Sequence, residues 1–169
     1  MKNLILLILT IICAFSKIDA QYPGQGLTVK SMEGNSKPFS SYINTEDGHV
    51  TLFVFWKTCC PTNLNMIDSL FELTDEYGES QDITVVLVSV DDTRSTDRVM
   101  PVVRTKGWKA DVILDVNMEL ARAMSVYIPP QWVAVDCKGN PIYRRKIMEG
   151  ESDAEYYFNE LISEIQKNE

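Results

Sequence analysis

Apolar runs alternate with amphipathic segments along most of the chain, and this alternation predicts strands separated by helices. The run from Val50 to Trp56 is dense in β-branched and aromatic residues, which is typical of a buried strand. The run from Ile83 to Val90 is apolar almost throughout, which favours a strand covered on both faces. The other expected strands cover residues 112–114, 132–135 and 142–145.

Helical periodicity appears between these strands. Residues 61–77 place apolar side chains three and four positions apart, and Gly78 follows as a stop signal. Residues 153–167 repeat the pattern as a closing amphipathic helix. Shorter helices are expected at 95–106, interrupted near Pro101, and at 118–124, capped by Asn117. A turn at Gly34-Asn35 predicts a short ribbon of residues 27–30 and 38–43.

The order of these elements predicts an α/β fold. Strands separated by helices pair in parallel through right-handed crossovers, whereas the hairpin at the turn 138–140 must be antiparallel. We therefore expect a mixed sheet of about five strands flanked by helices on both faces. The length and the absence of an internal boundary predict one domain over residues 21–169.

The first twenty residues have a different pattern. Lys2 precedes an almost unbroken apolar run from Leu4 to Phe15, and Ala20 offers a small residue before the rest of the chain. This plan is typical of a secretory signal peptide over residues 1–20, and the run is shorter than the roughly 20 residues that span a bilayer. We expect a secreted or periplasmic protein without stable membrane insertion after removal of this segment; a retained anchor is the alternative.

Charge and cysteine content narrow the function. The net charge of −8 at pH 7 argues against nucleic acid and anionic membrane surfaces as partners. Beyond the leader, the cysteines are Cys59, Cys60 and Cys137. An odd number with two adjacent members is not a disulfide framework, and in an exported chain it points to a reactive thiol.

Cys60 stands at the predicted start of a helix. It follows the buried strand and precedes Pro61, and proline is favoured at the first helical position. The positive end of the helix stabilises a thiolate, which is the nucleophilic form of cysteine. An inert buried cysteine is the alternative. We expect no metal and no cofactor, because the one histidine, His49, lies at the other end of the strand.

Two segments carry a resemblance to the thioredoxin superfamily. Phe53 to Asn63 (FVFWKTCCPTN) resembles the aromatic strand, tryptophan and helix-start cysteine of the exported TlpA-like disulfide reductases and their redoxin relatives. Val126 to Pro130, followed by a strand ending at Asp136, resembles the cis-proline segment of that family.

The resemblance, which spans residues 27–167, implies a thioredoxin-like fold and thiol-disulfide exchange. It assigns Cys60 as the nucleophile, with Pro130 in the cis-proline place. It implies a groove for an extended substrate chain, shaped by Pro129, Pro130, Pro61 and Asn63. The implied partners are protein thiols or disulfides of the cell envelope.

The chain departs from the Cys-x-x-Cys motif of the family. Asn63 stands where the resolving cysteine would be, and Val54 and Met66 stand where the family keeps an acidic proton carrier. We expect Cys59 to be an auxiliary or resolving thiol, and Asn63 to hydrogen-bond the thiolate. Two alternatives stay open: a non-catalytic binding module, and a redox sensor with a reversible Cys59–Cys60 bond. A peroxidase is disfavoured because the expected proline-first pattern is missing.

Overall fold

The structure is a computed structural model that describes residues 22–77, 82–148 and 153–168. The expected leader at 1–20 and the stop at Gly78 lie outside these residues. The strands are β1 (Thr28–Ser31), β2 (Ser36–Pro38), β3 (Val50–Trp56), β4 (Ile83–Ser89), β5 (Asp111–Leu114), β6 (Gln131–Val135) and β7 (Pro141–Lys146). The helices are α2 (Pro61–Tyr77), α3 (Val99–Lys106), α4 (Glu119–Ala123) and α5 (Ala154–Asn168), with short 3₁₀ helices η1 (Phe39–Tyr42) and η3 (Thr96–Arg98). No helix in the described ranges is long and apolar enough to cross a membrane.

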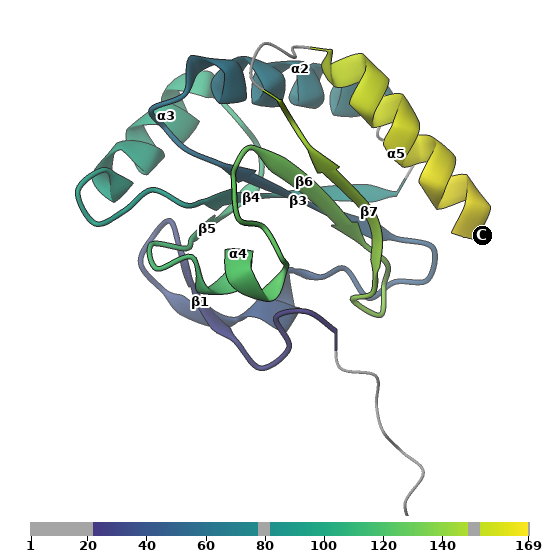
Figure 1. The fold of residues 1–169 in the computed structure, drawn as a ribbon, viewed down its shortest axis with the longest axis horizontal. Helices are drawn as coiled ribbons and strands as arrows, with labels where there is room; N and C mark the ends of the chain where they lie inside the picture. The colour runs from purple at the N-terminus through teal and green to yellow at the C-terminus, as the bar shows by residue number, and fades with distance from the viewer. Residues whose placement is uncertain (1–21, 78–81, 149–152, 169) are drawn as a thin grey trace, which may run out of the picture.

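The strands form one mixed sheet in the order β2-β1-β5-β4-β3-β6-β7 (Figure 1). β3, β4 and β5 are parallel, and β6, β7, β1 and β2 each run antiparallel to a neighbour. The prediction of an α/β mixed sheet is confirmed, but the prediction of about five strands is wrong. The β1–β2 ribbon pairs with the edge of β5, with Lys30 opposite Leu114, and adds two strands to the sheet.

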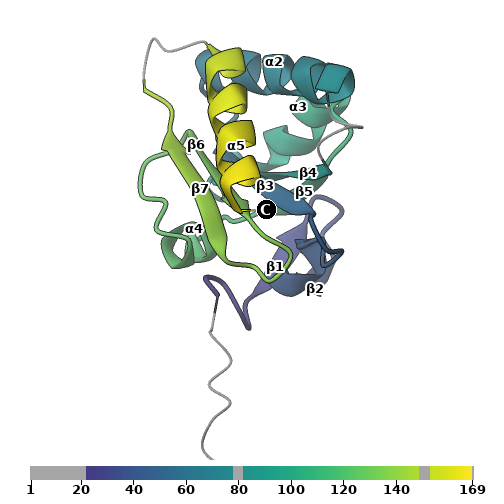
Figure 2. The ribbon, with the colours of Figure 1, turned by 90° about the vertical axis from the view of Figure 1, so that its right-hand side faces the viewer.

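Side chains of β3 alternate between two cores because successive residues of a strand point to opposite faces. Val54 and Trp56 pack in the core that α2, α3 and α5 cover, whereas Phe53 and Phe55 pack in the core that η1 and α4 cover. All four are at most 1% exposed. Figures 1 and 2 show α2, α3 and α5 on one side of the sheet and α4 on the other, so the expected helices on both faces are present.

Two local expectations were wrong in detail. The second strand of the ribbon covers Ser36–Pro38 rather than residues 38–43, because Phe39–Tyr42 turns into a 3₁₀ helix that buries Phe39 and Tyr42. The break in the segment 95–106 falls between Arg98 and Val99, so Pro101 lies inside α3, in its first turn, where a proline needs no N–H partner.

Asp115, rather than the predicted Asn117, caps α4. Its carboxylate accepts hydrogen bonds from the backbone N–H groups of Leu120 (3.2 Å) and Ala121 (2.8 Å). Asp115 is buried directly after β5, so the strand end brings a negative charge to the positive end of this helix.

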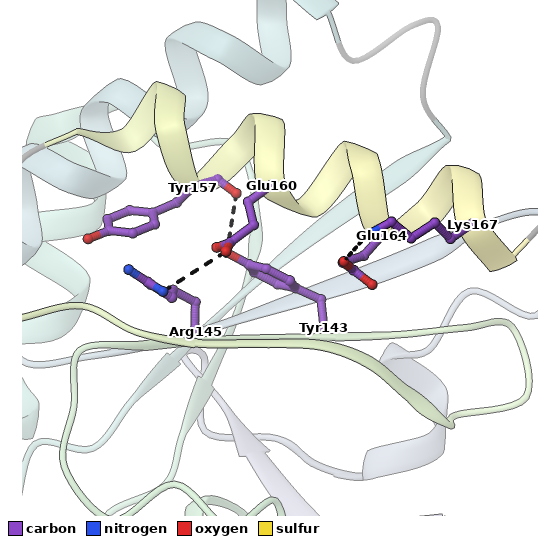
Figure 3. Close-up of polar contacts among 6 residues, drawn as sticks. All are labelled: Tyr143, Arg145, Tyr157, Glu160, Glu164 and Lys167. Carbon is purple, nitrogen blue, oxygen red and sulfur yellow. Dashed lines mark hydrogen bonds and ion pairs between the residues drawn. The ribbon is translucent and has the colours of Figure 1, made fainter.

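A polar cluster joins α5 to β7 (Figure 3). The Tyr143 hydroxyl donates to the Glu160 carboxylate at 2.9 Å, and the carbonyl of Tyr157 lies 3.3 Å from the same hydroxyl. The Arg145 guanidinium lies 4.0 Å from Glu160 and 4.9 Å from the centre of the Tyr157 ring. Burial, followed by the hydrogen bond to Glu160, raises the pKa of Tyr143 well above its usual range.

This shift predicts a loss of stability in alkali. The folded pKa is raised, so the contribution of Tyr143 is fully present below about pH 10, the unfolded value, and is lost as pH rises from there toward the folded value. Tyr143→Phe is expected to make the fall in unfolding free energy above pH 10 shallower, by up to about 1.4 kcal/mol per pH unit. Urea denaturation at several pH values checks this, with the exposed Tyr127→Phe as control. Equal slopes for Tyr143→Phe and wild type would contradict it.

Candidate active site at the start of α2

Two segments that are distant in sequence meet beyond the end of β3. β3 and β6 are antiparallel, with Phe55 opposite Gln131, so the residues after β3 and before β6 emerge at the same edge of the sheet. Cys60 precedes α2 at this edge, and the Pro129–Pro130 peptide bond, which is cis, precedes β6. The two segments singled out in the sequence therefore lie side by side.

These segments and the end of β7 enclose a hollow of about 340 Å³. β7 reaches it because the N–H of Ile147 donates to the carbonyl of Pro130 at 3.1 Å. Of the predicted site residues, the hollow is lined by Cys60, Asn63, Pro129 and Pro130. Cys59 and Pro61 are exposed and do not line it.

Cys60 occupies the start of the first turn of α2. Its carbonyl accepts hydrogen bonds from the N–H groups of Asn63 (3.1 Å) and Leu64 (3.3 Å). Cys60 is half-buried and Cys59 is exposed, and both are free thiols. The structure therefore presents the Cys60 thiol at the positive end of a helix, on the wall of the hollow.

A buried carboxylate that the sequence analysis missed anchors the loop before Cys59. Asp91, 2% exposed, accepts hydrogen bonds from the Thr58 N–H (3.0 Å), the Thr58 hydroxyl (2.7 Å) and the Ser89 hydroxyl (2.9 Å). Ser89 lies opposite Trp56 on the parallel strand β4. Asp91, after β4, and the loop after β3 therefore leave the sheet at the same end. The sequence did carry a signal for this contact: Ser89 and Asp91 are polar residues at and just after the end of a largely apolar strand.

Removing the charge of Asp91 is expected to destabilise this loop. Asp91→Asn keeps the shape but turns one acceptor oxygen into a donor that faces other donors, and the expected loss in unfolding free energy is about 2 kcal/mol. Urea denaturation measures it. Asp97→Asn, an exposed acidic residue nearby, is the control and should stay within about 0.5 kcal/mol of wild type. A similar result for both variants would contradict the anchoring role.

Asn63 contributes a buried amide to the wall of the hollow. It is 2% exposed, and its Oδ1 has no hydrogen-bond partner among the described residues. Val54 and Met66 are buried apolar side chains, so neither can act as an acid or a base here. Within the described part of the chain, Lys146 is the one charged residue that lines the hollow.

Large apolar side chains are exposed around the hollow. Ile128 and Met148, each 59% exposed, line it, and Tyr127, 72% exposed, precedes Ile128. Exposed apolar groups gathered in one place indicate an interaction surface. We call these three residues the apolar rim.

Cys137 lies at the opposite end of the sheet. It follows β6, whose Val135 pairs with Thr51 near the start of β3, and it lines a separate hollow of about 440 Å³ together with His49. At about 3.3 Å per residue along β3, Cys137 is roughly 20 Å from Cys60, too far for a disulfide. Over the residues that the structure describes, no three His, Cys, Asp or Glu side chains are grouped so as to hold a metal ion.

Comparison with known proteins places the chain among redox proteins. A model of the AhpC/TSA family matches residues 19–144, well over half of the sequence. No curated protein matches the chain.

Solved structures share the fold at low identity. An uncharacterized thioredoxin-like protein from Porphyromonas gingivalis is 23% identical, with a TM-score of 0.70 over 89% of this chain and 95% of that one. A secreted disulfide oxidoreductase from Mycobacterium tuberculosis, described as homologous to Escherichia coli DsbE, is 14% identical (TM-score 0.63; 83% and 95% covered). A peroxiredoxin Q mutant from Xanthomonas campestris is 15% identical (TM-score 0.66; 84% and 93% covered). The predicted thioredoxin-like fold is thereby confirmed.

Proposed function

The chain belongs to the AhpC/TSA family, and from this premise we propose that it is an exported thiol-disulfide exchange protein. Cys60 is its nucleophile and Cys59 an auxiliary thiol. Pro129, Pro130 and Asn63 shape the substrate groove, and Pro61, which is exposed outside the hollow, begins the helix after Cys60. One observation carries the proposal: the free thiol of Cys60 lies at a helix start and lines the same hollow as Pro129–Pro130.

The reaction is an exchange between the Cys60 thiolate and a substrate disulfide. The thiolate attacks one substrate sulfur, a mixed disulfide forms, and the other sulfur leaves as a thiolate that takes a proton from solvent. Asn63 cannot supply the second thiol that completes a reduction. That thiol is Cys59 or one from outside the protein. We propose that the Asn63 amide, which lines the same hollow, donates a hydrogen bond to the Cys60 sulfur.

Proteins of the cell envelope are the proposed partners. The apolar rim beside the hollow suits a protein partner, because such surfaces bind apolar side chains. The leader pattern at 1–20 supports export, as does the likeness to a M. tuberculosis oxidoreductase that is described as secreted.

The test is covalent capture by the reduced full-length protein. We expect incubation with a disulfide-bonded protein such as insulin to give a mixed disulfide that peptide mass spectrometry assigns to Cys60. Alkylation of free thiols before the digest prevents exchange after the reaction. The proposal would be overturned if the folded protein formed no adduct at Cys60 while the same protein, unfolded in urea, formed an adduct with the same disulfide.

A binding or redox-sensing module is the second candidate, and Asn63 favours it because no resolving cysteine is present at that position. In such a module the apolar rim would hold a partner without turnover. Partner binding that persists with an unreactive Cys60 supports binding, whereas a reversible Cys59–Cys60 bond without turnover supports sensing. A peroxidase is less well supported, since the hollow is lined by Thr62 and two prolines but by no arginine in the described residues.

A further inference from the structure

We propose that the hollow beside Cys60 selects a small, anionic, cysteine-derived disulfide, and that Cys60 captures one half of it. The inference rests on the proposed exchange activity and adds the chemical class of a substrate. The reduced form of this substrate is a thiol from outside the protein that can release Cys60, a role for which the motif of this chain has no second cysteine.

The size of the hollow suits a small ligand. Its volume of about 340 Å³ lies at the lower end of the range of about 300–1,000 Å³ that is usual for small-molecule sites. Pro129, Pro130 and Ile147 give it apolar walls from two different segments. One half of a small disulfide can therefore lie against these walls with its sulfur next to Cys60.

Lys146 gives the hollow a positive charge. It is exposed, and within the described residues no acidic side chain forms an ion pair with it. The chain as a whole has a net charge of −8, so this cation is opposite in sign to the protein around it. A carboxylate on the ligand would be attracted to Lys146 at short range.

Asn63 gives the hollow a polar group without a partner. Its Oδ1 is buried and accepts no hydrogen bond from the described residues, and a buried acceptor without a donor is unfavourable. Because Asn63 lines the hollow, a turn of its side chain toward the hollow would let this oxygen accept a hydrogen bond from an amine or amide N–H of the ligand. A cysteine unit carries its sulfur, an N–H and a carbonyl or carboxylate within a few bonds, so it offers one group to each of Cys60, Asn63 and Lys146, which line the same hollow.

The step balances without a further reagent. The Cys60 thiolate attacks the small disulfide R–S–S–R, a Cys60–S–S–R bond forms, and R–S⁻ leaves and is protonated by solvent. Cys60 is oxidised, and the small disulfide, which is the oxidant, is reduced. Attack by the small thiol on this adduct reverses the step and frees Cys60.

Three disulfides of different charge test the selection on the reduced full-length protein. They are anionic oxidised glutathione, neutral bis(2-hydroxyethyl) disulfide and cationic cystamine. Rates of adduct formation at Cys60 are read by peptide mass spectrometry and divided by the rates for the same cysteine in urea, which removes differences in intrinsic reactivity. We expect oxidised glutathione to be about tenfold faster than the neutral disulfide, and cystamine to be slowest. The net charge of the protein alone predicts the opposite order.

Variants assign the effect to the two side chains. Lys146→Gln should bring the rates with oxidised glutathione and the neutral disulfide within about twofold, and Lys146→Glu should reverse the preference. Lys138→Gln, an exposed lysine at the far end of the sheet, is the control and should change nothing. Asn63→Leu also removes the proposed hydrogen bond to the Cys60 sulfur, so it should slow both disulfides. It should slow oxidised glutathione more than the neutral disulfide, which offers hydroxyls but no N–H. Cystine, which carries a carboxylate close to each sulfur but has no net charge near pH 7, is tested beside oxidised glutathione to distinguish the free amino acid from the tripeptide as the source of the shared chemistry.

The outcomes separate this inference from the proposed function. Exchange at Cys60 with equal normalised rates for all three disulfides, unchanged in Lys146→Gln, would overturn the selection and leave the exchange activity standing. No adduct at Cys60 with any small or protein disulfide would overturn both.

Discussion

Replacing Cys60 with serine is expected to lower the rate of disulfide exchange by about two orders of magnitude or more, because a serine hydroxyl cannot form the mixed disulfide. Cys60 is half-buried at a helix start, where serine is a favoured residue, so the variant should fold with an unfolding free energy within about 1 kcal/mol of wild type. The exchange rate is measured by quenching the reaction at set times with an alkylating agent and quantifying the mixed disulfide by mass spectrometry. Urea denaturation verifies the fold.

The other two cysteines provide matched controls for this loss. Cys59 is exposed and outside the hollow, and Cys137 lies at the opposite end of the sheet. Cys59→Ser and Cys137→Ser should keep the first exchange step within about threefold of wild type, since neither removes the attacking sulfur. If Cys59 is the second thiol, Cys59→Ser alone should lengthen the lifetime of the mixed disulfide. A loss in Cys59→Ser as large as in Cys60→Ser would instead assign the nucleophile to Cys59.

Local patterns were sufficient for the elements that carry Cys60. The bounds of β3 and α2 agree with the predicted strand and helix, because burial on both faces of β3 and one apolar stripe on α2 leave periodic signals in the sequence. The segment before β6 was recognised through its resemblance to the cis-proline segment of the thioredoxin superfamily, since two prolines before a strand also fit a plain turn. The sheet has more strands than expected because the pairing of β1 with β5 depends on a contact between residues far apart in sequence.

The parts of the site that were missed depend on tertiary contacts. Lys146 and Met148 reach the hollow only because β7 pairs with β6, with Lys146 opposite Gln131. Asp91 reaches Thr58 because β4 is parallel to β3 and ends at the same edge of the sheet. In the sequence Lys146 is one of three consecutive basic residues, and Asp91 precedes another aspartate, so neither stood out. For α4 the cap was assigned to the nearest polar residue, whereas the strand end at Asp115 holds the carboxylate in place.

Replacing Asn63 with cysteine is expected to place a second thiol in the hollow beside Cys60 and so to speed turnover. Asn63 lies one helical turn from Cys60 and lines the same hollow, and residues one turn apart have about the Cα separation, roughly 4.4–6.8 Å, that a disulfide needs. The new thiol could attack the mixed disulfide at Cys60, close a Cys60–S–S–Cys bond within the protein, and release the reduced substrate. The loss of a buried, unpaired amide oxygen should leave stability unchanged or raise it.

We expect Asn63→Cys to raise the rate of insulin reduction with dithiothreitol by about tenfold or more over wild type, because release no longer waits for an outside thiol. Asn63→Ser is the matched control, since it is similar in size and carries no thiol, and it should stay near the wild-type rate. The double variant with Cys60→Ser should lose the gain, which shows that both sulfurs act together. If Asn63→Cys forms the internal disulfide but insulin reduction does not rise, release of the mixed disulfide is not the slow step, and Cys59 or an outside thiol already performs it efficiently. If the gain persists in the double variant, the new cysteine is itself the nucleophile, and the assignment of that role to Cys60 is wrong.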